Sequence, residues 1–140
     1  MKPFLKSLFT ALLILLFAYA AVSKLAAFQV FRLQLSRQAI PEGVAHVLLY
    51  LLPVSELSIV LLLFIERTYY AGLQFALCLM ILFTGYAALT VLHFWSSYPC
   101  SCGGILGHMG WKVHLAFNTA FLIINIAAIN LHLEERRAVT

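Results

Sequence analysis

Residues 44–65 read VAHVLLYLLPVSELSIVLLLFI, a long apolar run with Pro53 and Glu56 near its middle. A helix of roughly 20 residues crosses the ~30 Å hydrocarbon core of a bilayer, because each residue adds ~1.5 Å of rise. The run is long enough to do this. It also lacks the alternation of apolar and polar residues that a strand of a membrane barrel requires. We therefore predict that residues 44–65 form a transmembrane helix.

Three further apolar runs extend the pattern to four helices. The predicted helices cover about residues 4–27, 44–65, 69–95 and 112–132. Hydrophobic residues make up 64% of the 140-residue chain and charged residues 10%, whereas soluble domains average about half and about a quarter. A soluble protein of this size could not bury so much apolar surface, and disordered chains carry more charge. The composition predicts an all-α membrane protein, a four-transmembrane-helix bundle forming a single domain over residues 1–140.

The first run has a second interpretation, a cleaved secretory signal peptide. Lys2 and Lys6 precede an apolar stretch, and Ala18-Tyr19-Ala20 has the small-x-small spacing of a cleavage site. The apolar run nevertheless continues beyond this point to Ala27. We therefore favour an uncleaved helix.

The net charge of +4 raises the question of nucleic-acid binding. Nucleic-acid-binding proteins gather Lys and Arg on one face, whereas here these residues are scattered at the ends of the apolar runs, as membrane anchors are. With both termini inside, five of the nine basic residues lie on the inner side. The positive-inside rule then predicts a multi-pass membrane protein with cytoplasmic termini and with the loop at residues 96–110 on the outer side.

Residues 28–40 join the first two runs and mix apolar side chains with glutamine, arginine and serine. This mixture is typical of an amphipathic segment that lies in the membrane interface. We expect such a segment on the outer side, closed by Pro41-Glu42-Gly43, and a tight inner turn at Glu66-Arg67.

The loop at residues 96–110 reads SSYPCSCGGILGHMG and carries Cys100 and Cys102. Cα atoms two residues apart are roughly 5.5–7 Å distant, which overlaps the range that a disulfide can bridge. A bond closing so short a loop stabilises little, and strain makes it easily reduced. The spacing therefore favours a redox couple. If the loop lies on the outer face of the membrane, its compartment also permits disulfides.

Two other interpretations of the cysteines stay open. They could be inert thiols or a passive disulfide, or they could bind Cu(I), which thiolate and thioether ligands select. Soft or imidazole ligands occur nearby in the sequence, namely Met109, His93, His108 and His114. The spacing matches no strong metal signature, so we assign no residue to a metal site. Cys78, inside the third run, is predicted to be a small buried hydrophobe.

Glu56 is the most costly polar residue in the predicted spans. It could relay protons, contact a quinone head group or pair with a basic residue, or it could simply hold helices together. The nearest basic candidate is Lys24. Counted along straight helices, Glu56 lies some 18 Å below the outer start of its helix and Lys24 only about 5 Å deep. Contact would need a tilt or a break at Pro53, unless Lys24 snorkels outward.

Polar and aromatic residues recur at helical spacing in the last two runs. In the fourth run the steps of 4, 3, 4 and 7 join His114, Asn118, Phe121, Asn125 and His132. In the third run the steps of 4 and 3 join Tyr86, Thr90 and His93. Each set lies on one helix face. We interpret most of them as interhelical hydrogen-bonding groups worth about 0.6–2 kcal/mol per contact, and His114 as a candidate acid or base.

Four short motifs resemble the MauE branch of the MauE/DoxX membrane proteins. They are Ala21-x-Ser23-Lys24-Leu25, Leu52-Pro53-x-x-Glu56-Leu57, Pro99-Cys100-Ser101-Cys102-Gly103-Gly104 and Gly110-Trp111-Lys112-x-His114-Leu115-x-Phe117-Asn118. The cysteine-loop motif is the most specific of them. The resemblance implies a four-helix inner-membrane protein that works with a thioredoxin-like partner in the maturation of exported, disulfide-rich proteins. The arrangement is also similar to vitamin K epoxide reductase-like bundles, in which a cysteine pair opens a helix near a quinone.

The chain departs from that last pattern, because it has C-x-C in place of C-x-x-C and no second loop pair. A single thiol relay is therefore expected rather than a complete quinone-linked cycle. We expect thiol–disulfide exchange with Cys100, Cys102 and His114 as catalytic residues. The predicted cofactor-binding residues are Glu56, Lys24, Asn118 and Trp111. The cofactor stays open between a quinone and Cu(I), and the alternative functions are a non-enzymatic membrane subunit or assembly factor and a Cu(I)-binding accessory protein.

Overall fold

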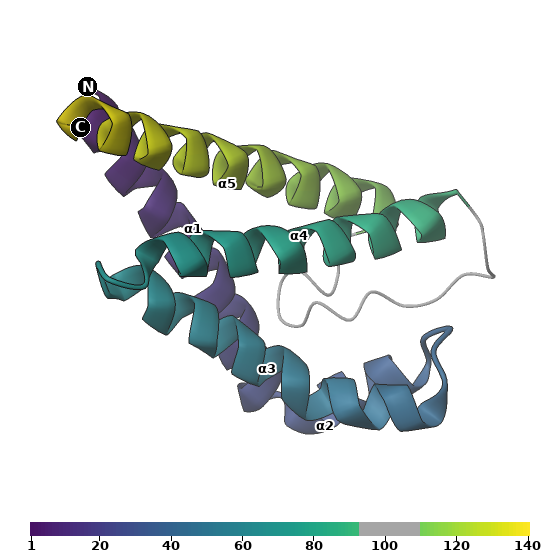
Figure 1. The fold of residues 1–140 in the computed structure, drawn as a ribbon. Coiled ribbons are helices and arrows are strands. Elements are labelled where there is room, and N and C mark those ends of the chain that lie inside the picture. Colours follow the sequence, from purple (N-terminus) through teal and green to yellow (C-terminus); the bar gives the residue numbers. More distant parts are fainter. Residues whose placement is uncertain (93–109) are drawn as a thin grey trace.

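The computed structural model describes residues 1–92 and 110–140. The described residues form helices and no strand, in the order α1 (Lys2–Ala26), α2 (Phe28–Ser36), α3 (Glu42–Phe64), α4 (Tyr69–Val91) and α5 (Trp111–Val139) (Figure 1). The helices α1, α3, α4 and α5 are long and apolar enough to cross a membrane. The predicted all-α fold with four membrane-spanning helices is confirmed.

The short helix α2 occupies the position predicted for the amphipathic segment between the first two spans. Its buried side chains, Phe31 and Leu35, pack against Ala45 and Leu49 near the start of α3. Its other apolar residues include Val30 and Leu33, which are exposed. One face of α2 therefore covers α3, and the rest lies at the surface of the bundle.

The four long helices pack around one apolar core. The helix α1 contacts both α3 and α5, and α4 contacts both α3 and α5. Figure 1 shows α4 and α5 side by side, whereas α1 runs obliquely across the bundle. The innermost core side chains, all at most 1% exposed, are Leu13, Phe17, Ile59, Leu73, Ala76, Met80 and Ala128.

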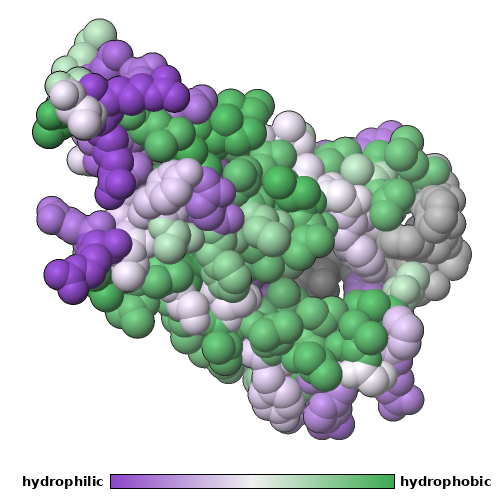
Figure 2. All heavy atoms as spheres, in the orientation of Figure 1, coloured by the Kyte–Doolittle hydropathy of each residue, from purple (hydrophilic) through white to green (hydrophobic). Residues whose placement is uncertain are grey.

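The fifth helix continues to Val139, beyond the predicted end near residue 132. The extra turns are polar and pair with the start of α1: Lys2 Nζ lies 2.7 Å from Glu134 Oε2, and Lys6 Nζ lies 2.6 Å from Glu135 Oε2. These ion pairs hold the two termini together at one end of the molecule (Figure 1). Figure 2 shows hydrophilic side chains gathered at that end and apolar ones over the middle of the same face.

Candidate functional site

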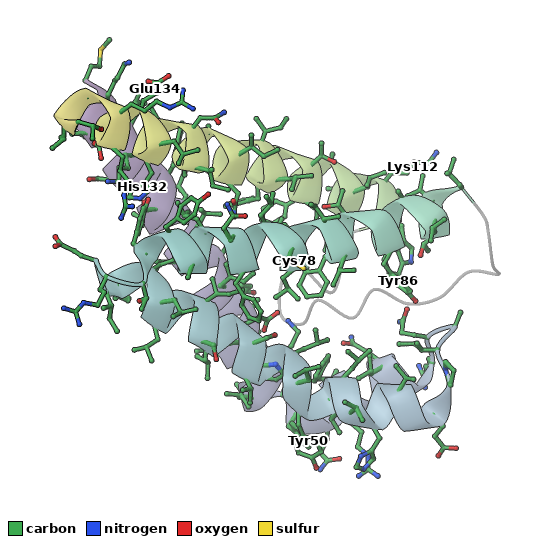
Figure 3. All side chains as sticks on the ribbon, viewed as in Figure 1. Tyr50, Cys78, Tyr86, Lys112, His132 and Glu134 are labelled. Carbon is green, nitrogen blue, oxygen red and sulfur yellow. The ribbon has the colours of Figure 1, made fainter. Side chains whose placement is uncertain are left out.

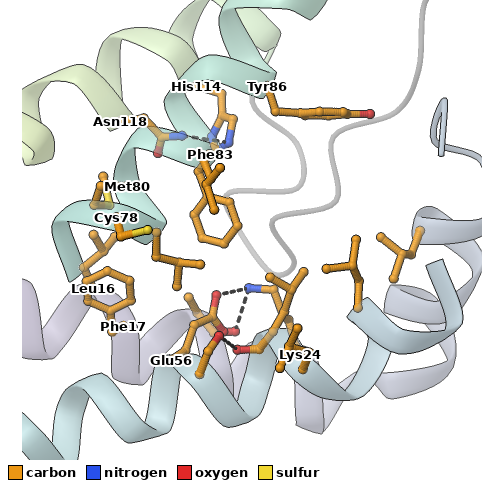
Figure 4. A pocket seen from close by; sticks show the side chains of 18 of the residues that line it. Leu16, Phe17, Lys24, Glu56, Cys78, Met80, Phe83, Tyr86, His114 and Asn118 are labelled. Atoms are coloured by element: carbon orange, nitrogen blue, oxygen red, sulfur yellow. Dashed lines mark hydrogen bonds and ion pairs between the residues drawn. The ribbon is translucent and has the colours of Figure 1, made fainter. Parts of the chain in front are cut away.

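A buried ion pair joins α1 to α3. The Nζ atom of Lys24 lies 2.8 Å from Oε1 of Glu56, and the two side chains are only 6% and 1% exposed. Lys24 also donates to the carbonyl oxygen of Ala20 at 3.3 Å. Lys24 and Glu56 are therefore in direct contact, and Lys24 does not snorkel outward (Figure 4).

Two local features lie next to the Lys24–Glu56 pair. Pro53 lies inside α3, nearly one turn before Glu56, where it removes a backbone hydrogen bond from the helix. After α1 ends at Ala26, the chain continues into α2, and the Phe31 ring of α2 lies over Lys24 with Nζ 5.7 Å from the ring centroid. On straight helices Lys24 and Glu56 would lie at different depths, whereas α1 runs obliquely across the bundle (Figure 1).

The second carboxylate oxygen of Glu56 is buried and has no hydrogen-bond partner among the described residues. Buried ionised groups are costly unless their remaining lone pairs are also satisfied. Lys24 satisfies Oε1, so Oε2 retains the capacity to accept a hydrogen bond. This orphaned acceptor is the most unusual chemical feature that the pair presents.

The pair forms part of the wall of a cavity of about 420 Å³, here called the Lys24–Glu56 cavity. All five helices contribute to its lining among the described residues, and most of the lining side chains are leucine or aromatic. Polar groups on the wall belong to Lys24, Gln38, Ser55, Glu56, Tyr86, Trp111, His114 and Asn118. A largely apolar cavity of this size with a few polar groups is typical of small-molecule sites.

The start of α5 provides one side of this cavity. His114 and Asn118 are 6% and 5% exposed, and Asn118 Nδ2 lies 3.5 Å from His114 Nε2, a long hydrogen bond. The Trp111 ring meets the His114 ring edge-on with their centroids 5.9 Å apart. Trp111, His114 and Asn118 all line the cavity, together with Lys24 and Glu56. The structure thus brings together five of the predicted site residues.

The other two predicted site residues, Cys100 and Cys102, lie outside the described residues, as do His93, His108 and Met109. Within residues 1–92 and 110–140, no three His, Cys, Asp or Glu side chains gather as a metal site would require.

Two cavity residues were missed or misjudged from the sequence. Tyr86 Oη donates to Gln38 Oε1 at 2.7 Å and ties α4 to the segment after α2, toward which Tyr86 points in Figure 3. Nothing in the local sequence distinguishes Gln38 from the other glutamines of its segment. Cys78 lines the cavity and is exposed, so the prediction of a buried cysteine is wrong. Cys78 lies on the face of α4 between the bundle core and the surface.

The interpretation of the polar stripes as interhelical hydrogen bonds is wrong for three residues. Asn125 is fully buried, yet neither atom of its amide has a partner among the described residues. The His132 ring nitrogens also have none there, and this ring packs between Tyr69 and Tyr70 with centroid distances of 5.1 and 5.7 Å. Thr90 donates within its own helix, to the carbonyl oxygen of Tyr86 at 3.0 Å.

Comparison with known proteins gives one match. The sequence model of the family described as "Methylamine utilisation protein MauE" matches residues 2–131. No curated protein and no solved structure matches the chain. Because the family match covers nearly the whole chain, from the first residues of α1 to the last turns of α5, the chain belongs to the MauE family of membrane proteins.

Proposed function

We propose that this MauE-family protein performs thiol–disulfide exchange with a thioredoxin-like partner through Cys100 and Cys102. The observation that carries the proposal is the position of His114. It lies in the first turns of α5, which follows the cysteine segment in the chain, and it lines the Lys24–Glu56 cavity with Trp111. The C-x-C spacing supports the proposal independently, because a disulfide in so short a loop is easily reduced.

The exchange proceeds through a mixed disulfide. One cysteine thiolate attacks a sulfur of the partner's disulfide, the partner's S–S bond breaks, and a bond to this chain forms. The second thiolate then attacks that bond, which closes the Cys100–Cys102 disulfide and releases the partner as a dithiol. Two electrons pass from the cysteine pair to the partner, and the two thiol protons end on the partner's thiols. His114 accepts and returns these protons, and a partner dithiol drives the same steps in reverse.

The proposed place for this chemistry is the periplasmic face of the bacterial inner membrane, with the termini in the cytoplasm. That compartment permits disulfides, and exported proteins that need correct disulfides are the proposed clients. Cys102 is the proposed attacking thiol because it is closer in the chain to α5, whose N-terminus favours a thiolate.

Thiol trapping in living cells tests the proposal. A membrane-impermeant maleimide is applied with and without prior reduction, and labelled peptides are identified by mass. We expect Cys100 and Cys102 to react only after reduction. The variants Cys100→Ser and Cys102→Ser should each lose exchange, and one of them should accumulate a mixed disulfide with the partner. The matched control Cys78→Ser should behave like the native protein.

Three outcomes would contradict the proposal. Equal labelling of both cysteines without reduction, and again after treatment of the cells with a thiol oxidant, means that the pair stays a dithiol and does not cycle through a disulfide. Absence of labelling under both conditions places the cysteines away from the periplasm. Normal maturation of exported proteins in both serine variants assigns the chain to the alternative class, a non-enzymatic membrane subunit or assembly factor.

A further inference from the structure

The Lys24–Glu56 cavity has walls that also face the bilayer. Leu51 of α3 and Phe75 and Leu82 of α4 line the cavity, yet they are 53%, 47% and 61% exposed. Cys78, between the latter two, is exposed as well. Figure 1 shows α3 and α4 diverging from the turn that joins them. These exposed side chains therefore form a lateral rim of the cavity between α3 and α4.

The interior of the cavity selects for a hydrogen-bond donor without charge. Lys24 and Glu56 neutralise each other, so a charged ligand would leave an unbalanced charge in an apolar site. The Oε2 atom of Glu56 accepts no hydrogen bond from any described residue, and a hydroxyl group would satisfy it. A buried acceptor left without a donor is unfavourable.

Aromatic rings are the second feature of the lining. The rings on the wall belong to Phe17, Phe75, Phe83, Tyr86, Trp111 and Phe117. Such rings pack favourably against another ring in offset or edge-on arrangements. Figure 4 shows Phe83 on the same side of the cavity as His114 and facing the Lys24–Glu56 pair. A ring that carries a hydroxyl group could therefore contact both the aromatic wall and the carboxylate.

We propose that the Lys24–Glu56 cavity binds a lipid-soluble phenol or quinol, which enters from the bilayer between α3 and α4 and donates its hydroxyl hydrogen bond to Glu56 Oε2. The volume of about 420 Å³ accommodates a substituted ring with part of an alkyl tail. This binding site is separate from the proposed thiol exchange, because the proposed contacts involve neither Cys100 nor Cys102.

Two matched probes test the hydrogen bond. The compound 4-decylphenol carries the hydroxyl group, and its methyl ether has the same ring and tail without the donor. Native mass spectrometry of the full chain released from detergent micelles measures stoichiometry and affinity for both. We expect one bound 4-decylphenol per chain, with an affinity about tenfold or more above that of the ether, as a hydrogen bond to a charged acceptor would give. Equal affinities, or binding of neither compound, would overturn the proposal and leave water as the partner of Oε2.

Variants locate the site and its opening. Leu51→Trp places a large ring at the rim and should weaken phenol binding at least tenfold. Leu61→Trp is the matched control, because Leu61 lies on the same helix, is 63% exposed and does not line the cavity. The double variant Lys24→Leu/Glu56→Leu should remove the preference for phenol over ether. Equal effects of the two tryptophans, or a preference that survives in the double variant, would refute the assigned site.

The proposed thiol exchange is tested separately from this site. The double variant Cys100→Ser/Cys102→Ser should bind 4-decylphenol like the native chain, although it cannot form the disulfide. Loss of phenol binding in that variant would contradict the assignment of the site to Glu56.

Discussion

Breaking the Lys24–Glu56 pair from one side should destabilise the protein strongly. The substitution Lys24→Met keeps the length of the side chain and removes its charge, which leaves the Glu56 carboxylate buried without its partner. Because the two side chains are only 6% and 1% exposed, solvent gives little compensation. Removing one partner of a buried pair costs about 3–5 kcal/mol, and we expect a loss of that size in the free energy of unfolding.

The assay is a denaturation titration with sodium dodecyl sulfate in mixed micelles, followed by the helical circular dichroism signal. The matched control is Lys2→Met, because the Lys2–Glu134 pair is the same kind of contact with side chains 69% and 52% exposed. Water screens such a pair, so its loss should have little effect. The double variant Lys24→Leu/Glu56→Leu removes both charges and should recover most of the lost stability. The reasoning is refuted if Lys24→Met costs no more than Lys2→Met.

Two further predictions concern packing, and the same titration measures both. A Cβ atom at Gly72 would lie 3.0 Å from Leu62 Cβ and 3.1 Å from the Leu62 carbonyl carbon, so Gly72→Ala should cost about 1–3 kcal/mol. Gly85→Ala in the same helix meets nothing within 4 Å and should be neutral or stabilise by up to ~1 kcal/mol. Leu13 is 0% exposed, so Leu13→Ala should cost about 2–5 kcal/mol. Leu15→Ala, at a position 67% exposed, should cost far less, and equal effects within either pair would contradict the packing.

The number and type of the helices could be predicted from sequence because each span is decided locally. A run of about 20 apolar residues satisfies its backbone hydrogen bonds in lipid only as a helix, whatever its neighbours are. The end of α5, in contrast, is not decided by local hydropathy. Its last turns are polar and continue as a helix beside the start of α1, where Glu134 and Glu135 pair with Lys2 and Lys6. Contacts between the two ends of a chain leave no trace in local hydropathy.

In the site too, features set by local sequence could be predicted, whereas contacts between distant residues could not. Helical spacing correctly predicted that His114 and Asn118 share one face of the fourth span, and both line the Lys24–Glu56 cavity. The Lys24–Glu56 contact could not be predicted, because it depends on how α1 crosses α3 and on α2 covering Lys24 with Phe31. The hydrogen bond from Tyr86 to Gln38 could not be predicted either, because it joins residues far apart in sequence.

Buried ion pairs can often be exchanged for apolar side chains without loss of stability. Stability alone therefore does not explain a lysine on α1 and a glutamate on α3 at a contact inside an apolar bundle. The pair offers something that two leucines lack, which is a carboxylate oxygen able to accept a hydrogen bond inside an apolar cavity. The double leucine variant separates these roles. A stable protein that no longer distinguishes 4-decylphenol from its methyl ether assigns the pair to ligand binding, whereas unchanged selectivity assigns it to helix packing.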